Sequence, residues 1–242
     1  MRHNPANPRE LLGGEPEARP PRRRRWRWIA RGAALLVILA VAITGAVVEL
    51  TPGPAPLALP QGAAAPSGPL DGTWHVAAGS VAGFRIRETI IGFSNDVTGR
   101  TGDVAGTMVV ADAGVSRATF LVNLAAISAD GKTRQPQLMR SLGVTAHPDA
   151  SITLARPLPL PAAFSAGTMI TRTVPATLTL NGRTRPVSVT LTARRDGTAI
   201  EAAGSLPVAF ADFRIAGPAG FGFLGSLASS GTAEFLLILR LR

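Results

Sequence analysis

The hydrophobic pattern divides the chain into two parts. The 17 residues from Gly32 to Val48 carry no charge and are mainly Ala, Val, Leu and Ile, whereas beyond residue 70 apolar and polar side chains alternate. Alternation with a period of two is typical of strands that bury one face. The pattern therefore predicts one apolar helix followed by a domain built from β-strands.

The alternation is clearest over residues 82–87, 118–124 and 187–192, and Asn181-Gly182 is typical of a tight type I′ turn between two strands. Within the β domain only residues 134–142 have helical spacing, and the segment is short and contains a proline. Further strands are expected at 73–77, 95–110, 150–155, 168–175, 199–208 and 231–240. The pattern predicts an all-β domain with one short helix.

An antiparallel sheet with one apolar face has two ways of burying that face. With about eight strands it either closes into a barrel or folds into a sandwich. In a sandwich the apolar faces fill each other, whereas a barrel of that size can hold one ligand. Small residues at inward positions, such as Ala82, Ala118 and Ala176, favour a cavity, although long aliphatic side chains could fill it. The residues alone leave both architectures open.

The apolar run has the features of a membrane-spanning helix. At about 1.5 Å per residue it is roughly 26 Å long, near the short limit for a bilayer. Arg22–Arg25 and Arg27 precede it, so the positive-inside rule places the N-terminus in the cytoplasm. A cleaved signal peptide has the same order, and Thr44-Gly45-Ala46 could be cut, but a preceding tail of about 30 residues favours retention. Both alternatives export the β domain.

The predicted organisation is that of a single-pass protein of the cell membrane. Residues 1–31 form a cytoplasmic Arg-rich tail, 32–50 a transmembrane helix, 51–69 a Pro-rich linker and 70–242 an extracytoplasmic β domain. The tail holds nine Arg against three Glu, which we interpret as a topology signal and not as a nucleic-acid site. The linker contains six prolines. As polyproline II, at about 3.1 Å per residue, it would hold the domain up to roughly 60 Å from the bilayer.

Several segments of the β domain resemble the YceI-like family. In the family's order they are Leu70–Trp74, Ser80–Ile86, Leu142–Val144, His147–Thr153, Ala176–Val187 and Ala211–Ile215. The resemblance implies a lipocalin-like, extended antiparallel barrel with an apolar pore, in exported bacterial proteins that bind polyisoprenoid lipids or similar amphiphiles. This chain has Arg134-Gln135, Asn181-Gly182 and Phe213-Arg214 where the family usually has Arg-Asp, His-Gly and Phe-Gly. The resemblance therefore does not name the ligand.

The candidate lipid-binding residues are aliphatic and aromatic side chains at inward positions of the predicted strands. A prenyl chain gains roughly 25 cal/mol per Å² of apolar surface that it buries, so a tube lined by such side chains needs no catalytic group. The predicted lining residues are Phe84, Ile86, Phe120, Val122, Ile152, Leu178, Leu180, Val187 and Val189. The alternative for each of them is an ordinary core position.

A phosphorylated head group would need cations or hydrogen-bond donors at the barrel mouth. The candidates are Arg134, His147, Arg183 and Arg185, which lie on the predicted helix, before a strand and beside the predicted turn. For the arginines the alternative is a solvated surface charge. For the histidine it is a structural role.

The sequence does not support metal or enzyme chemistry. The chain has no cysteine, its three histidines are scattered, and it has no nucleophile elbow, phosphate-binding loop or zinc-protease motif. We therefore expect no metal, no catalytic residue, no nucleic-acid partner, and no cofactor unless a bound isoprenoid lipid is counted. The alternative function is a tethered protein-interaction module with a filled barrel core. Residues 235–239 are apolar on both faces, which suggests cover by a helix or by a homodimer.

Overall fold

The computed structural model describes residues 33, 36, 37, 39, 40, 54–90, 93–129, 135–216 and 225–242. The chain forms two compact units, Met1–Thr44 and Gly45–Arg242. The predicted tail and most of the predicted transmembrane helix lie outside the described residues. Among the residues that are described, no helix has both the length and the apolar character that a membrane crossing requires. The transmembrane helix therefore stays a prediction.

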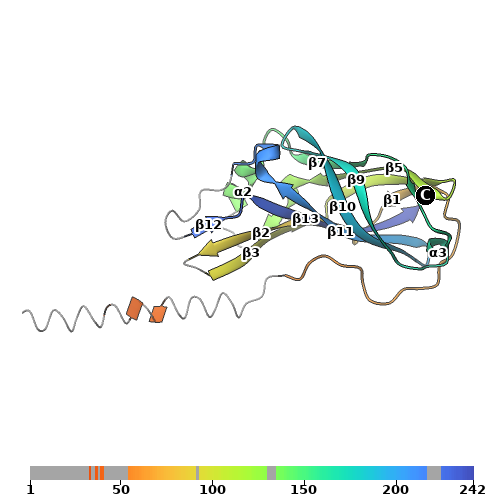
Figure 1. Ribbon diagram of the computed structural model, residues 1–242, viewed down its shortest axis with the longest axis horizontal. Coiled ribbons are helices and arrows are strands. Elements are labelled where there is room, and N and C mark those ends of the chain that lie inside the picture. Colours follow the sequence, from red (N-terminus) through yellow and green to blue (C-terminus); the bar gives the residue numbers. More distant parts are fainter. Residues whose placement is uncertain are drawn as a thin grey trace, which may run out of the picture. The chain divides into compact units, whose positions relative to one another are not determined.

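The second unit consists mainly of strands (Figure 1). Its strands are β1 Gly72–Val76, β2 Val81–Ile90, β3 Phe93–Thr101, β4 Val104–Ala111, β5 Gly114–Asn123, β6 Ser128–Ala129, β7 Asp149–Leu154, β8 Leu158–Pro159, β9 Ile170–Leu180, β10 Arg183–Asp196, β11 Ala199–Ala209, β12 Gly225–Leu227 and β13 Ser230–Leu241. Its described helices are the short α-helices α2 Gln135–Ser141 and α3 Ala162–Ser165 and the 3-10 helices η1 Leu124–Ala126 and η2 Phe210–Phe213.

Eight of these strands close into an antiparallel barrel. Their order is β1, β4, β5, β7, β9, β10, β11 and β13, and β13 pairs with β1 again. Trp74 of β1 lies opposite Leu241 of β13 and opposite Met108 of β4, which completes the ring. The other half of β13 pairs with β2, and the sheet continues from β2 to β3 and β6. The predicted barrel of about eight strands is confirmed, and the sandwich is excluded.

The structure also tests the predicted turns and strand limits. Asn181 and Gly182 have φ angles of 48° and 66°, as a type I′ turn requires, and they join β9 to β10. The single strand expected over residues 95–110 is two strands, β3 and β4, because the chain turns at Gly102-Asp103. The predicted helix is α2, and Arg134 at its predicted start lies outside the described residues.

The two ends of the barrel differ. We call the end that carries η1, α2, η2 and the β9–β10 turn the loop end, and the end that carries Trp74 and α3 the Trp74 end. Figure 1 shows α2 and α3 at opposite ends of the barrel. The Trp74 and Phe164 side chains are 1% and 2% exposed, and the Trp74 indole N–H donates to the Leu70 carbonyl at 2.8 Å. Large buried aromatic side chains therefore close the Trp74 end.

The proline-rich segment before β1 does not extend freely from the domain. Residues 54–69, which we call the strap, follow the barrel wall from the side of β2 and β3 toward α3 (Figure 1). The Arg194 Nη2 donates to the Pro60 carbonyl at 2.8 Å, and the Arg195 Nη2 donates to the Ser67 carbonyl at 2.7 Å. The predicted free spacer is therefore wrong for these residues, because their carbonyls accept hydrogen bonds from guanidinium groups of the barrel.

Residues 235–239 of β13 are apolar on both faces, and other parts of the same chain cover both faces. Leu237 and Leu239 belong to the core, whereas Leu236 and Ile238 are half-buried. Gly79 lies so close to Ile238 that a Cβ added to it would be 2.9 Å from the isoleucine Cδ1. The pattern at residues 235–239 therefore does not require a partner, and the homodimer stays a prediction.

We expect Gly106→Ala to lower the free energy of unfolding by about 2 kcal/mol. Gly106 has a φ of 147°, and a Cβ there would be 2.3 Å from the Thr119 carbonyl oxygen of β5. Urea unfolding followed by circular dichroism measures the loss. Gly102→Ala is the matched control, since its Cβ would be 3.7 Å from the nearest oxygen, and we expect a change within about 0.5 kcal/mol. Equal effects of the two substitutions would contradict the steric argument.

Candidate functional site

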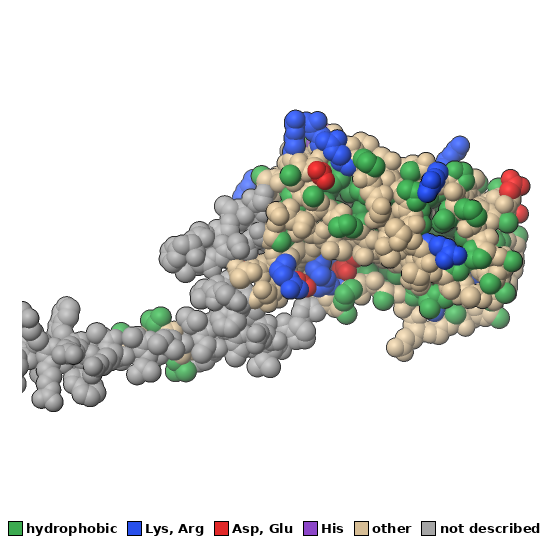
Figure 2. Space-filling view, viewed as in Figure 1, with side chains coloured by type: hydrophobic (Ala, Val, Ile, Leu, Met, Phe, Trp, Pro, Cys, Tyr) green, Lys and Arg blue, Asp and Glu red, His purple; other side chains and the backbone are tan. Residues whose placement is uncertain are grey.

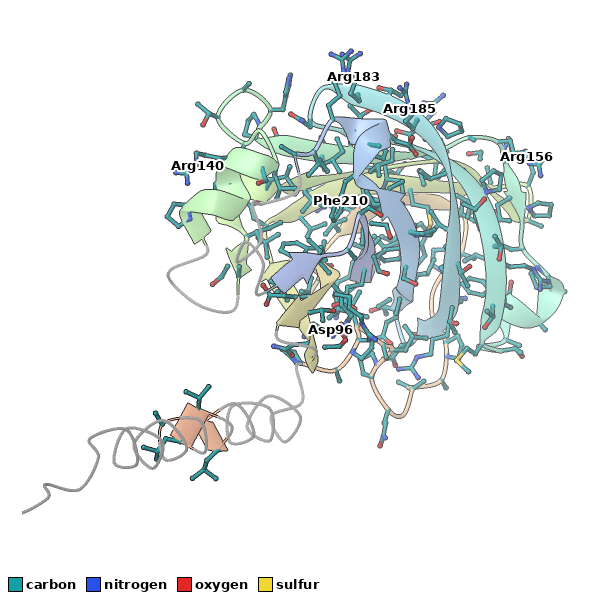
Figure 3. All side chains as sticks on the ribbon, turned by 60° about the vertical axis from the view of Figure 1, so that its left-hand side comes forward. Asp96, Arg140, Arg156, Arg183, Arg185 and Phe210 are labelled. Carbon is teal, nitrogen blue, oxygen red and sulfur yellow. The ribbon has the colours of Figure 1, made fainter. Side chains whose placement is uncertain are left out.

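The interior of the barrel contains a cavity of about 270 Å³. It extends through both hydrophobic clusters of the core, from Leu180 and Phe210 near the loop end to Phe164 and Ile170 near the Trp74 end. Figure 3 shows Phe210 within the barrel. A continuous apolar cavity of this kind suits a chain-like apolar guest, because it gains free energy from each stretch of surface that it buries.

The cavity offers few polar groups. Among the described residues that line it, those with a polar side chain are Ser151, Thr232 and Glu234. The Glu234 carboxylate is engaged on the outer wall, where it lies 3.3 Å from the Arg100 Nη2 and 3.7 Å from the Arg85 Nη2. The described ion pairs of the barrel therefore belong to its outside, and the interior resembles a hydrocarbon environment.

Most of the predicted lining residues lie around this cavity. Those that line it are Phe84, Ile86, Phe120, Val122, Ile152, Leu178, Leu180 and Val189. Val187 is half-buried and packs against the core cluster of the loop end, but it does not line the cavity. Whether any of these side chains contacts a lipid stays a prediction.

Strand register brings three of the predicted residues into one row. Phe120 of β5 lies opposite Ile152 of β7, which in turn lies opposite Leu178 of β9. Directly opposed residues point to the same face of a sheet, so these side chains form one apolar strip across three strands. Alternation in the sequence identified the strip without any knowledge of the pairing.

Two glycines make room for aromatic side chains of the lining. A Cβ at Gly99 would be 2.5 Å from the Phe84 ring, and a Cβ at Gly106 would be 2.8 Å from the Phe120 ring. Each ring therefore packs over the bare backbone of the neighbouring strand.

Sequence reasoning missed a group of lining residues near the loop end. They are Leu206, Val208, Phe210 and Ile215, from β11, η2 and the residue that follows shortly after η2. The first three alternate with Ser205, Pro207 and Ala209, so the signal was the same period of two. Ile215 follows a 3-10 helix, and no periodicity could have assigned it to the interior.

The candidate head-group arginines that are described lie at the rim of the barrel. The register pairs Arg183 with Leu180 and Arg185 with Leu178, so both arginines continue the rows of cavity-facing residues. Their side chains extend away from the interior (Figure 3), and Arg185 is exposed. Arg134 lies outside the described residues. The arginines could therefore meet a polar group outside the cavity, but not one inside it.

His147 has a packing partner instead of a position at the cavity. A Cβ at Gly182 would be only 2.6 Å from the His147 Nε2, so the exposed imidazole lies against the β9–β10 turn. The same turn is held from its other side, where the Asn181 Nδ2 donates to the Phe213 carbonyl at 3.1 Å. These contacts favour the structural alternative for His147. They also explain why an Asn-Gly turn suits this position.

The described residues contain no group of three or more His, Asp or Glu side chains that could hold a metal ion. The His75 and His147 side chains belong to opposite ends of the barrel, since β1 carries Trp74 and the β9–β10 turn lies at the loop end. The main chemical capability of this arrangement is therefore to bind the apolar surface of a ligand.

Comparison with known proteins supports this reading of the fold. A model of the YceI-like domain matches residues 74–231. A polyisoprenoid-binding domain from Saccharophagus degradans, implicated in plant cell wall breakdown, superposes with a TM-score of 0.55 at 19% identity, covering 70% of this chain and 98% of that one. BcnA of Burkholderia cenocepacia gives a TM-score of 0.50 at 17% identity, with coverages of 66% and 94%. A search of curated proteins found no match. Because the domain model covers more than half of the chain, the protein belongs to the YceI-like family.

Proposed function

We propose that the protein is a non-enzymatic binding protein for a long-chain isoprenoid or a similar amphiphilic lipid, anchored to the membrane by its N-terminal helix with the barrel outside the cytoplasm. It would carry or sequester the lipid. The observation that carries the proposal is the continuous apolar cavity, to which both core clusters contribute. Membership of a family that includes a polyisoprenoid-binding domain supports the class of ligand.

The loop end is the better entrance to the cavity. At the Trp74 end the exit is filled by side chains that are nearly inaccessible to solvent. At the loop end the cavity is covered by short elements, of which α2 has seven residues and η1 has three. Short helices have little stability of their own, so they can open at a smaller free-energy cost than paired strands. Lipid would pass through this cover.

The size of the cavity limits how much of a lipid it holds. Its volume of about 270 Å³ lies just below the range of roughly 300–1,000 Å³ that is common for sites of drug-sized ligands. A long prenyl chain would therefore fill the cavity only in part, unless the cover at the loop end moves outward. The head group would stay at the rim, near Arg183 and Arg185.

Native mass spectrometry tests the proposal directly. The full chain is purified from membranes in a mild detergent, and lipids that remain bound are identified after they dissociate in the gas phase. We expect a co-purified isoprenoid or a related amphiphile at a stoichiometry near one. Repeated recovery of protein that carries no lipid, and that takes up no prenyl alcohol or prenyl phosphate on addition, would overturn the proposal.

The volume of the cavity also favours a second candidate, the tethered interaction module whose barrel is a filled core. Ala118→Phe separates the two functions. Ala118 lines the cavity and its side chain is buried. If the cavity accepts lipid, we expect the phenylalanine to fill it and to weaken prenyl binding at least about tenfold, with a change in unfolding free energy below about 1 kcal/mol.

The control for this substitution is Ala105→Phe on the adjacent strand β4. Ala105 is exposed and does not line the cavity, so both binding and stability should stay close to the wild type. A filled core predicts a different result, in which Ala118→Phe destabilises the fold by about 1–3 kcal/mol through overpacking and no prenyl probe binds either variant.

A further inference from the structure

We propose that the strap, residues 54–69, turns the loop end of the barrel toward the bilayer, so that the entrance of the cavity faces the surface that supplies the lipid. The inference rests on the membrane anchor of the proposed function. It is carried by the contacts that bind the strap to the barrel wall, because they decide at which part of the barrel the preceding chain begins.

The strap begins on β2, β3 and β13. The Arg85 Nη2 donates to the Pro54 carbonyl at 2.6 Å, and the Arg100 Nη2 donates to the Ala55 carbonyl. The Leu57 amide donates to the Glu234 Oε2 at 3.2 Å. Figure 2 shows basic and acidic side chains together at this place on the surface. The carboxylate of Glu234, with 4% of its side chain exposed, thus binds both arginines and the strap.

This starting point belongs to the loop-end half of the barrel. Phe84 and Ile86 are the neighbours of Arg85 in β2, and both pack in the core cluster of the loop end. Their side chains point inward while the guanidinium of Arg85 points outward, since successive residues of a strand alternate in direction. Residue 54 therefore lies outside the wall that encloses the loop-end part of the cavity.

The strap ends at the opposite end of the barrel. The Ala64 amide donates to the Asp196 Oδ1 at 2.6 Å. The Arg195 Nη2 donates to the Ser67 and Gly68 carbonyls at 2.7 Å and 3.0 Å, and the Arg195 Nη1 lies 3.5 Å from the carbonyl of Ser165 in α3. The residue is 4% exposed. One buried guanidinium thus joins the strap to the helix that marks the Trp74 end.

The composition of the strap suits this role. Proline restricts the chain to extended conformations and has no amide hydrogen, so little conformational entropy is lost on docking and few donors are left without partners. The arginines bind main-chain carbonyls, which every residue possesses. A segment of Pro, Gly and Ala can therefore be held firmly although its side chains resemble those of a spacer.

The length of the strap, together with these contacts, determines which end of the barrel lies nearer the bilayer. Its 16 residues reach roughly 50 Å at about 3.1 Å per residue, and the 12 residues of β13 extend about 40 Å. The strap is therefore long enough to follow the barrel from one end to the other. Because it is docked along the barrel, these residues do not hold the barrel away from the bilayer as the predicted linker would. The end of the predicted span at residue 50 and Pro54 are four residues apart in the sequence, a separation that the chain bridges over at most about 14 Å. Chain continuity alone then keeps residue 54 near the bilayer.

Amide hydrogen exchange of the full chain in micelles tests whether the strap is docked. The Leu57, Ala64 and Ser67 amides donate to the barrel. We expect them to exchange at least about 100-fold more slowly than the exposed Gly62 and Ala63 amides. Equal rates at all five positions would overturn the docked strap.

Energy transfer then tests the orientation. The chain has no cysteine, so Thr145→Cys beyond α2 and Ala163→Cys in α3 each give one label site, and both positions are exposed. The full chain is reconstituted in phosphatidylcholine vesicles that contain an acceptor-labelled phosphatidylethanolamine. We expect transfer from position 145 to exceed transfer from position 163 at least about twofold, because the two ends of the barrel are roughly 40 Å apart.

Release of the strap provides the matching variant. Arg85→Met with Arg100→Met and Glu234→Leu removes the bonds that hold Pro54, Ala55 and Leu57 on the barrel, and we expect the difference between the two labels to shrink. Arg172→Met is the control, because within the described part of the chain this exposed arginine bonds only to the neighbouring Thr171 carbonyl. Equal transfer from both labels in the otherwise unmodified chain overturns the orientation without affecting lipid capture. Failure of the chain to join the vesicles overturns the proposed anchor instead.

Discussion

Trp74→Ala is expected to lower the free energy of unfolding by about 3–5 kcal/mol. The indole is 1% exposed, lies at the closure between β1 and β13, and donates a hydrogen bond to the Leu70 carbonyl. Its removal leaves a cavity at the Trp74 end that strands on both sides cannot collapse to fill. The midpoint of urea unfolding of the full chain in micelles, followed by far-ultraviolet circular dichroism, measures the effect.

Trp74→Phe is the matched control for this substitution. It keeps most of the ring volume and removes the indole N–H, so a loss of about 1–2 kcal/mol is expected. If the alanine and phenylalanine variants unfold at the same urea concentration, the stability comes from the hydrogen bond and not from the packing. If neither variant differs from the wild type, Trp74 does not close the barrel as described.

Glu201→Leu alone is expected to destabilise the protein by about 3–5 kcal/mol, whereas Arg194→Met/Glu201→Leu should stay within about 1 kcal/mol of the wild type. The Glu201 Oε2 accepts hydrogen bonds from Arg194 at 2.7 Å and 3.0 Å, and both residues are buried beneath the strap. Removal of one partner leaves an uncompensated charge, while removal of both leaves apolar contacts. A double-mutant cycle on unfolding free energies measures the coupling.

Arg87→Met serves as the control for the loss of an arginine. Its side chain is 67% exposed and pairs with Asp96 at 3.4 Å, so solvent already screens the interaction and a change below about 0.5 kcal/mol is expected. Additive effects in the cycle at Arg194 and Glu201 would show that the pair is solvated, and hence that the strap does not cover it.

Most of the predicted cavity-lining residues could be identified from the sequence because the strands of the barrel share one alternating pattern. In β2, β5, β7, β9 and β10 most inward positions are apolar and most outward positions are polar, so a period of two identified eight residues that line the cavity. The Asn181-Gly182 turn was predictable for a similar reason, since both of its residues need a positive φ. The choice of a barrel over a sandwich was different, since it followed from the resemblance to a family and not from periodicity.

The docking of the strap and the elements that cover the loop end could not be predicted from this pattern. Arg194, Arg195 and Glu201 look like solvated charges in the sequence, and only the folded wall shows that residues 54–69 lie over them. Ile215 reaches the cavity from an irregular segment that has no periodicity. Contacts between segments more than 100 residues apart depend on topology, which local patterns do not encode.

The pairing of β1 with β13 has a consequence for biogenesis. The first strand of the barrel completes the ring only with residues 239–241 of β13, which are far from it along the chain. Glu234, which accepts a hydrogen bond from the Leu57 amide, lies on the same distant strand. Contacts between such distant segments form late and slowly. The barrel therefore stays unclosed until β13 has been synthesised, and any factor that shields its strands has to act until then.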